Sequence, residues 1–296
     1  MPSCKQGLRA VARVGRVLNE CCFDAACVAC GEGVGSRESR ESEDTRLLEV
    51  AAAARYAGVC SSCLRRLLDE LLPIAAAEPG PACAPYSHTS HTSHTSHTSH
   101  TGHNSRCSRC SRTLISEHEL CAGCRATEFA FSEAYALFEY RGLARKLLWL
   151  YKFENHKPLA ELFAALLYHG RLQQRSTAAV VPVPAQRRSR ARRGWDQIEV
   201  IARRLRRSYA IPVVRALTRA RGKASQKQLG RHDRFAQAAL QYRVAAAKAT
   251  KVGVPAAGSV VLLDDVITTG ATASACAELL IAAGAGRVEV VSLMVR

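Results

Sequence analysis

A short segment near the C-terminal end of the sequence limits the fold more than any other. Four apolar residues, Val260 to Leu263, are followed by the adjacent acids Asp264 and Asp265 and by small or hydroxyl-bearing residues from Thr268 to Thr272. The apolar run predicts a buried parallel strand, and the pattern from about Ala273 to Ala283 predicts a helix after it. The segment therefore predicts a strand that ends in two carboxylates, then a turn, then a helix.

The acids and the turn together predict a site for a phosphorylated sugar. The carboxylates of Asp264 and Asp265 can accept hydrogen bonds from two sugar hydroxyls or hold a hydrated divalent metal, and they stand where ligands bind in open α/β sheets. The alternative is a buried strand with a capped helix behind it, which leaves an electrostatically costly pair of acids. The N–H groups that can bind a phosphate belong to Thr268, Thr269, Gly270, Ala271 and Thr272.

The second half of the chain alternates predicted strands and helices. Strands are predicted over about 129–140, 178–183, 259–264 and 287–295, and helices over about 143–152, 158–169, 196–209 and 273–283. This alternation is typical of an α/β fold, with a parallel sheet and helices on both of its faces.

The cysteines predict one or two structural zinc sites. Of 13 cysteines, twelve precede residue 125, and eight form the Cys-x-x-Cys pairs Cys27/Cys30, Cys60/Cys63, Cys107/Cys110 and Cys121/Cys124. The N-terminal stretch lacks the apolar core of a signal peptide, so we expect reduced thiols that bind zinc rather than disulfides. Two such pairs suit one tetrahedral zinc. An interleaved pairing of the four motifs stays open, and the alternative is a set of buried cysteines without metal.

Composition divides the chain into two predicted domains. A small zinc-ribbon module covers residues 1–128, and the α/β domain covers residues 129–296. The module carries an insertion at about 73–104, which holds four prolines and five Ser-His-Thr repeats from Ser87 to Thr101. This tract has no apolar residue to bury, which favours a low-complexity insertion; the alternative is a histidine-rich metal-binding tract.

Charge and hydropathy limit which partners and which cellular location we expect. The 42 Lys and Arg against 25 Asp and Glu give a net charge of +17, which fits a polyanionic partner such as nucleic acid, a phosphorylated ligand or an acidic membrane surface. No run of 18 apolar residues is present, so we expect no membrane span and a cytoplasmic protein.

The motifs and their order resemble a known family. Val260 to Thr272 resembles the 13-residue phosphoribosyl-pyrophosphate motif of type I phosphoribosyltransferases, and contains neither a Walker A loop nor a Gly-x-Gly fingerprint. Upstream stand Lys152-Phe153, the Val-Pro-Val-Pro run ending at Pro184, the run from Arg193 to Gln197, and an arginine-rich stretch from Arg219 to Arg234. With the four Cys-x-x-Cys pairs, this order resembles the ComF family of competence-associated, phosphoribosyltransferase-like proteins with an N-terminal double zinc ribbon.

The resemblance implies a type I phosphoribosyltransferase-like fold and a role for each motif. Asp264 and Asp265 would hold the ribose as the catalytic pair, and the turn from Thr268 to Thr272 would hold the 5′-phosphate. Mg²⁺ is the implied cofactor beside structural Zn²⁺. The pyrophosphate and the closing loop would involve Val183, Pro184, Arg219, Arg221, Lys223, Gln226 and Arg234. The substrate region would include Lys152, Arg193, Gly194, Trp195 and Gln197.

Two further features qualify the resemblance. The family often has Phe and Asn where this chain has Trp195 and Asp196, which keeps an aromatic group and adds a negative charge. The arginines at 187–193 could instead form a solvated or nucleic-acid-binding face.

Three functions are compatible with these motifs. The first is transfer of phosphoribose from phosphoribosyl pyrophosphate to an acceptor in a DNA-uptake context. The second is a non-catalytic protein that binds single-stranded DNA, although in the sequence few aromatic residues stand among the arginines. The third is an adaptor that docks to competence or helicase proteins through its zinc ribbons.

Overall fold

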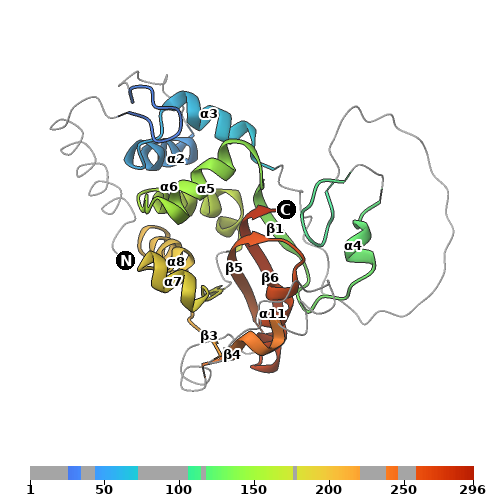
Figure 1. The fold of residues 1–296 in the computed structure, drawn as a ribbon. Coiled ribbons are helices and arrows are strands. Elements are labelled where there is room, and N and C mark those ends of the chain that lie inside the picture. Colours follow the sequence, from blue (N-terminus) through green and yellow to red (C-terminus); the bar gives the residue numbers. More distant parts are fainter. Residues whose placement is uncertain are drawn as a thin grey trace, which may run out of the picture.

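A sheet of four parallel strands forms the centre of the structure (Figure 1). The computed structural model describes residues 26–34, 44–72, 106–114, 118–175, 179–220, 238–245 and 258–296. The strands are ordered β1-β6-β5-β2, and all three pairings are parallel. Their bounds are β1 Ala134–Glu139, β2 Ala179–Pro182, β5 Ser259–Ile267 and β6 Arg287–Val295. The predicted parallel sheet flanked by helices is confirmed.

Helices cover both faces of this sheet. Because successive side chains of a strand point to opposite faces, Val261 and Leu263 pack into one apolar core, whereas Val260 and Leu262 pack into another. The first core contains α5, α6 and α8, and the second contains α11. These helices span Gly142–Phe153, Leu159–Gly170, Gln197–Tyr209 and Ala271–Ala282.

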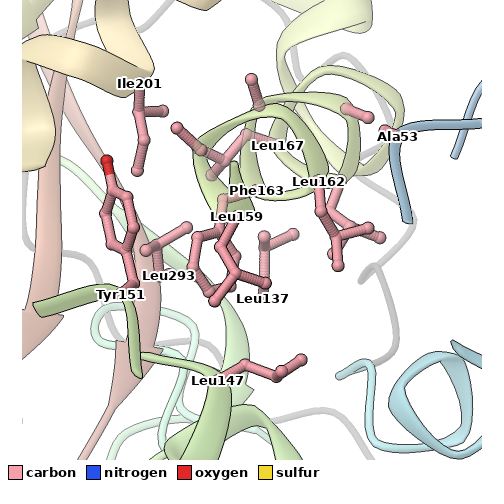
Figure 2. Close-up of a cluster of buried hydrophobic side chains, with 14 of the residues drawn as sticks. Ala53, Leu137, Leu147, Tyr151, Leu159, Leu162, Phe163, Leu167, Ile201 and Leu293 are labelled. Carbon is pink, nitrogen blue, oxygen red and sulfur yellow. The ribbon is translucent and has the colours of Figure 1, made fainter. Parts of the chain in front are cut away.

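The first core is centred on α6. Figure 2 shows Phe163 and its neighbours on α6 between Leu137 of β1, Leu293 of β6, Tyr151 of α5 and Ile201 of α8. Leu159, Leu162, Phe163, Leu166 and Leu167 are buried, so the buried side runs along most of the helix. Truncation of Phe163 to alanine would cost about 3–5 kcal/mol, which makes α6 the main anchor of this face.

The N-terminal helices belong to the same core. Helices α2 (Thr45–Tyr56) and α3 (Ser61–Asp69) bury Ala53 and Leu67 in the cluster that holds Phe163. Just after α3, both carboxylate oxygens of Glu70 accept hydrogen bonds from the first amides of α5, at 2.9 Å from Leu143 N and from Ala144 N. Glu70 therefore satisfies two N–H groups that the start of a helix leaves free.

The unit that contains Cys107, Cys110, Cys121 and Cys124 lies along the edge strand β1. The Ala134 N–H donates to the Arg109 carbonyl at 2.8 Å, and the Ser111 hydroxyl donates to the Ala134 carbonyl at 2.6 Å. Thr113 bonds to Glu139 at the other end of the strand. The short helix α4 (Ala122–Arg125) completes this unit.

Other described elements lie around the sheet. They are the 3-10 helix η1 (Leu172–Arg175), helix α7 (Arg187–Arg193) and an antiparallel ribbon of β3 (Leu217–Arg219) with β4 (Tyr242–Val244). In the part of the chain that the structure describes, no helix has the length and apolar character needed to cross a bilayer. The Ser-His-Thr tract lies outside the described residues.

The motif segment folds with different boundaries from those predicted. Strand β5 continues through both acids to Ile267, and helix α11 begins at Ala271. The turn is therefore shorter than the predicted turn from Thr268 to Thr272. The strand extends because β6 continues beside it, so that Val266 and Ile267 pair with Met294 and Val295.

Candidate functional site

The two acids lie at the carboxyl edge of the sheet, beside the end of β2. Leu263 pairs with Pro182, and the Val183 N–H donates to the Leu263 carbonyl at 2.9 Å. The structure therefore brings the Val183–Pro184 loop next to Asp264 and Asp265. Ligands of open α/β sheets bind at this edge.

Asp265 is held by a chain of polar side chains. One of its oxygens, Oδ2, lies 2.7 Å from Lys152 Nζ and accepts a 2.7 Å hydrogen bond from Gln197 Nε2. Gln197 in turn accepts a 2.7 Å bond from Arg193 Nη2. Two of these donors come from α5 and α8. The predicted substrate-region residues Lys152, Arg193 and Gln197 thus lie together, linked to the second acid.

Asp264 has a different environment. Its Oδ1 accepts the backbone N–H of Asp265 at 2.8 Å. Burial, and next the negative charge of Asp265, raise the pKa of Asp264 to about 7. Among the described residues, the second oxygen of each acid, Asp264 Oδ2 and Asp265 Oδ1, has no hydrogen-bond partner. These two oxygens are free to accept hydroxyl protons or to face a cation.

The turn after β5 presents backbone amides. Gly270 has φ +79, and a Cβ there would lie 2.6 Å from the Phe129 ring, so only glycine fits. The N-cap residue of α11 is Gly270, which has no side chain to cap the helix. Ala271 N makes a long 3.4 Å contact with the Thr269 hydroxyl. The first amides of this twelve-residue helix therefore remain available for an anion.

Arg219 lies beside the Val183–Pro184 loop. It donates to the Pro184 carbonyl at 3.2 Å and to the Tyr242 hydroxyl at 2.6 Å, and its guanidinium lies 4.6 Å from the centre of the Tyr242 ring. The Ala220 N–H donates to the Gln241 carbonyl at 2.9 Å, so the two ends of the intervening segment meet next to the site. Arg221, Lys223, Gln226 and Arg234 lie outside the described residues.

The Gly194-Trp195-Asp196 run packs against residues next to the site. Trp195 is buried and packs edge-on against Tyr151, with ring centroids 4.8 Å apart. Gly194 ends α7 in the left-handed conformation, with φ 75. Asp196 caps α8 through Oδ1 and accepts the Ala185 N–H through Oδ2 at 2.9 Å. The negative charge at residue 196 therefore serves the helix and the loop.

The eight paired cysteines form two separate groups. Cys27, Cys30, Cys60 and Cys63 lie within 4.8 Å of one another at their Sγ atoms, and so do Cys107, Cys110, Cys121 and Cys124. The pairing is the consecutive one, not the interleaved one. Four thiolates bound to one zinc at about 2.3 Å lie about 3.8 Å apart, and the Sγ atoms of Cys30 and Cys60 and those of Cys110 and Cys121 are separated by 3.8 Å. Each group could hold one zinc ion.

The first pair of each group sits in the same type of turn. Gly31 N donates to the Cys27 carbonyl at 2.7 Å, and Ser111 N donates to the Cys107 carbonyl at 2.9 Å. Both residues have positive φ, 82 for Gly31 and 63 for Ser111. Ser111, which is not a glycine, is held in this conformation by the hydrogen bond from its hydroxyl to the Ala134 carbonyl. These matching turns fit a double zinc ribbon.

Sequence reasoning missed two residues of this region. Tyr242 binds Arg219, and Arg112, from the second cysteine group, donates to the Thr268 carbonyl of the turn at 3.3 Å. No local motif marks either one. Their partners lie 23 and 156 residues away in the sequence, beyond the reach of any periodicity.

Comparison with known proteins agrees with the motifs. No protein-family model matches the chain. Competence protein F of Haemophilus influenzae is 26% identical over 177 residues, which cover 57% of this chain and 76% of that protein. This similarity, with the two cysteine groups, confirms the resemblance to the ComF family.

Proposed function

We propose that this chain binds phosphoribosyl pyrophosphate with Mg²⁺ and transfers its phosphoribosyl group to an acceptor. The observation that carries the proposal is the pair of acids at the end of β5, each with one free oxygen, beside a turn that leads into α11 with a glycine as its N-cap. The relative named competence protein F supports a competence-related context.

The donor would be held at three points. The free oxygens of Asp264 and Asp265 would accept the two ribose hydroxyls, and the amides from Thr268 to Thr272 would bind the 5′-phosphate. The loop at Val183 and Pro184 would lie beside the pyrophosphate, with Arg219 behind it. The separation of carboxylates from amides suits a ligand with a hydroxylated centre and an anionic end.

The chemistry needs no nucleophile from the protein. The acceptor forms a bond to C1 of the ribose while the bond from C1 to pyrophosphate breaks, and pyrophosphate leaves with its electron pair. Mg²⁺, when bound, would neutralise part of the pyrophosphate charge. Carboxylate oxygens are suitable ligands for this ion, and Asp264 and Asp265 would hold it directly or through its water. Lys152 keeps Asp265 oriented during the reaction through its 2.7 Å contact.

Thermal denaturation tests this proposal. Phosphoribosyl pyrophosphate with Mg²⁺ should raise the Tm, because a ligand that binds only the folded state stabilises it. The double variant Asp264→Asn with Asp265→Asn should lose the shift, whereas Asp69→Asn, at an exposed position of α3, should keep it. A folded wild-type protein that shows no shift would refute the site. Pyrophosphate release with a panel of nucleobases and amines would then test transfer.

A second candidate function is the binding of single-stranded DNA, which one arrangement favours. The exposed rings of Trp149 and Phe153 lie 6.1 Å apart on α5, and Arg192 of α7 lies 5.9 Å from the Phe153 ring centre. No residue of α7 is buried. Exposed aromatic rings beside arginines are typical of surfaces on which bases stack while cations contact the phosphates. Arg192 follows Trp149 and Phe153 by about forty positions in the sequence.

Fluorescence anisotropy with a labelled oligonucleotide tests the second candidate. Trp149→Ala with Phe153→Ala should weaken binding by about 1–3 kcal/mol for each base that stacks, and binding should fall steeply as salt rises. Tyr56→Ala, which removes another exposed ring on α2, is the matched control. Equal affinity of the double variant and the wild type would rule out this surface.

A further inference from the structure

Residues next to the second cysteine group contact the turn that would hold the 5′-phosphate. This group comprises Cys107, Cys110, Cys121 and Cys124, and it lies along the edge strand β1 rather than at the acids. Three contacts nevertheless connect it, or the chain that follows it, to the segment from Thr268 to Ser274. Each one comes from a different residue.

The first contact is made by Arg112, two residues after Cys110. Its Nη2 donates to the Thr268 carbonyl at 3.3 Å and also to a backbone oxygen of Arg296, which directly follows β6. The Arg296 N–H donates to the Ile267 carbonyl at 2.9 Å. Arg112 therefore joins the end of β5, the end of β6 and the first residue of the turn.

The second contact is made by Phe129, which follows Cys124 by five residues. Phe129 packs against the apolar side of the cysteine group and against the core around α11. Its ring also occupies the space where a side chain on Gly270 would lie, with the built Cβ at 2.6 Å. The position of this ring therefore limits where the backbone of the turn can go.

The third contact follows directly along the chain. The Ala130 N–H donates to the Ser274 hydroxyl at 3.1 Å. Ser274 is buried near the start of α11. Phe129 and Ala130 therefore contact both the turn and the helix whose first amides would bind the phosphate.

We infer that the second cysteine group, when it holds zinc, fixes the phosphate-binding turn, with Arg112 as the positioning residue. This inference rests on the proposed function. It makes binding of the 5′-phosphate depend on zinc in the second cysteine group. The turn's carbonyl is held by a guanidinium and its glycine by an aromatic ring, and both come from one small unit whose own core consists mainly of cysteines. Without metal, that unit would retain little apolar core to hold Arg112 and Phe129 in place.

Isothermal titration with ribose 5-phosphate tests the role of Arg112. Arg112→Met keeps the length of the side chain and removes its donors, so we expect about tenfold or greater loss of affinity, the usual effect of losing a charge-assisted hydrogen bond. Arg112→Lys, which keeps one charged donor, should restore part of it. Arg125→Met is the matched control, because Arg125 is exposed in the same unit and donates to Leu120 within it.

Pyrophosphate serves as the second probe, because it would bind the loop after β2 rather than the turn. Its affinity should be the same in Arg112→Met and in the wild type, since only the phosphate turn is disturbed. Loss of affinity for both probes would indicate a general defect and would overturn the positioning role. Unchanged affinity for ribose 5-phosphate would overturn it as well.

Metal removal provides an independent arm. Cys121→Ser changes a partly exposed member of the group, and we expect it to lower the zinc content by one ion per chain and to weaken ribose 5-phosphate binding as Arg112→Met does. Full affinity after loss of that zinc would refute the coupling. A wild-type protein that binds zinc but not ribose 5-phosphate would instead refute the proposed function, and the coupling with it.

Discussion

Two neighbouring acids of the same type differ in how the protein holds them. Asp265 faces the ammonium group of Lys152 and the amide of Gln197. Asp264 receives one backbone N–H and is half-buried next to a like charge. A ligand or cation that approaches this pair therefore meets one carboxylate that is already oriented and one whose raised pKa leaves it only partly ionised near neutral pH.

The pKa of Asp264 predicts a dependence of stability on pH. Its folded-state pKa is about 7, above the ordinary value of 3.8. Between these values the folded protein keeps a proton that the unfolded chain has released, so the free energy of unfolding falls as the pH rises from about 4 to about 7. The full effect is on the order of 4 kcal/mol.

Urea denaturation at two pH values measures this effect. Asp264→Asn should stabilise the protein at pH 8, where the wild type carries the penalty, and should change little at pH 4. Asp265→Asn should not stabilise it at pH 8, because Lys152 loses its charged partner. Equal effects of Asp264→Asn at both pH values would contradict the raised pKa.

At the residue scale, sequence reasoning reached the acids and the turn but not their surroundings. Asp264, Asp265 and the glycine are adjacent in one motif, so their pattern is visible locally. Lys152 and Gln197 were predicted near the substrate only through the family resemblance, and their shared bond to one oxygen of Asp265 depends on how α5 and α8 pack. Packing of this kind has no signature in a single sequence.

At the scale of elements, one aspartate connects a helix to the loop beside the proposed pyrophosphate. Asp196 uses one oxygen to cap α8 and the other to accept the Ala185 N–H. An asparagine has only one acceptor oxygen, so it could keep the cap or the loop bond but not both. The acidic residue at 196 is thus explained by structure rather than by ligand chemistry.

Substitution at Asp196 should therefore show two levels of destabilisation. Asp196→Ala removes the cap and leaves the Ala185 N–H unpaired, at a cost of about 2–3 kcal/mol. Asp196→Asn should cost about half as much, because one acceptor remains. Urea denaturation at pH 7 measures both. Equal losses for the two variants would show that only the charge matters.

Sequence patterns predicted elements well wherever apolar residues repeat. The strand at 287–295 was predicted with the bounds that the structure has, and α5, α6 and α8 begin and end within two residues of their predictions. Helix α7 was missed because none of its residues is buried, which leaves no periodicity to detect. The β3–β4 ribbon was missed because each strand has three residues and its partner lies far along the chain.

At the scale of the whole molecule, the two cysteine groups are attached to the sheet in different ways. The first shares one continuous core with α2, α5 and α6. The second has a small core of its own and rests on β1. The predicted division at residue 128 stays a prediction about domains, but the first group is packed into the core of the second half.

Metal analysis of the purified protein should find two zinc ions per chain, one for each cysteine group. Cys63→Ser and Cys124→Ser should each remove one ion. Because Cys63 is buried in the main core, its substitution should lower the Tm more than that of Cys124 does. Fewer than one zinc per chain in the wild type would refute both sites.

The hydrogen bonds from the start of α5 to Glu70 have a consequence for cleavage of the polypeptide chain. After a break within the Ser-His-Thr repeats, the N-terminal fragment would still carry Glu70 to cap α5 and the α2 and α3 side chains that fill the core beside α6, so the two fragments need not separate. The protein is in this sense a natural candidate for fragment complementation. Two chains made apart, one carrying Glu70 and the other carrying Lys152, would rebuild a single folded body without a covalent link between them.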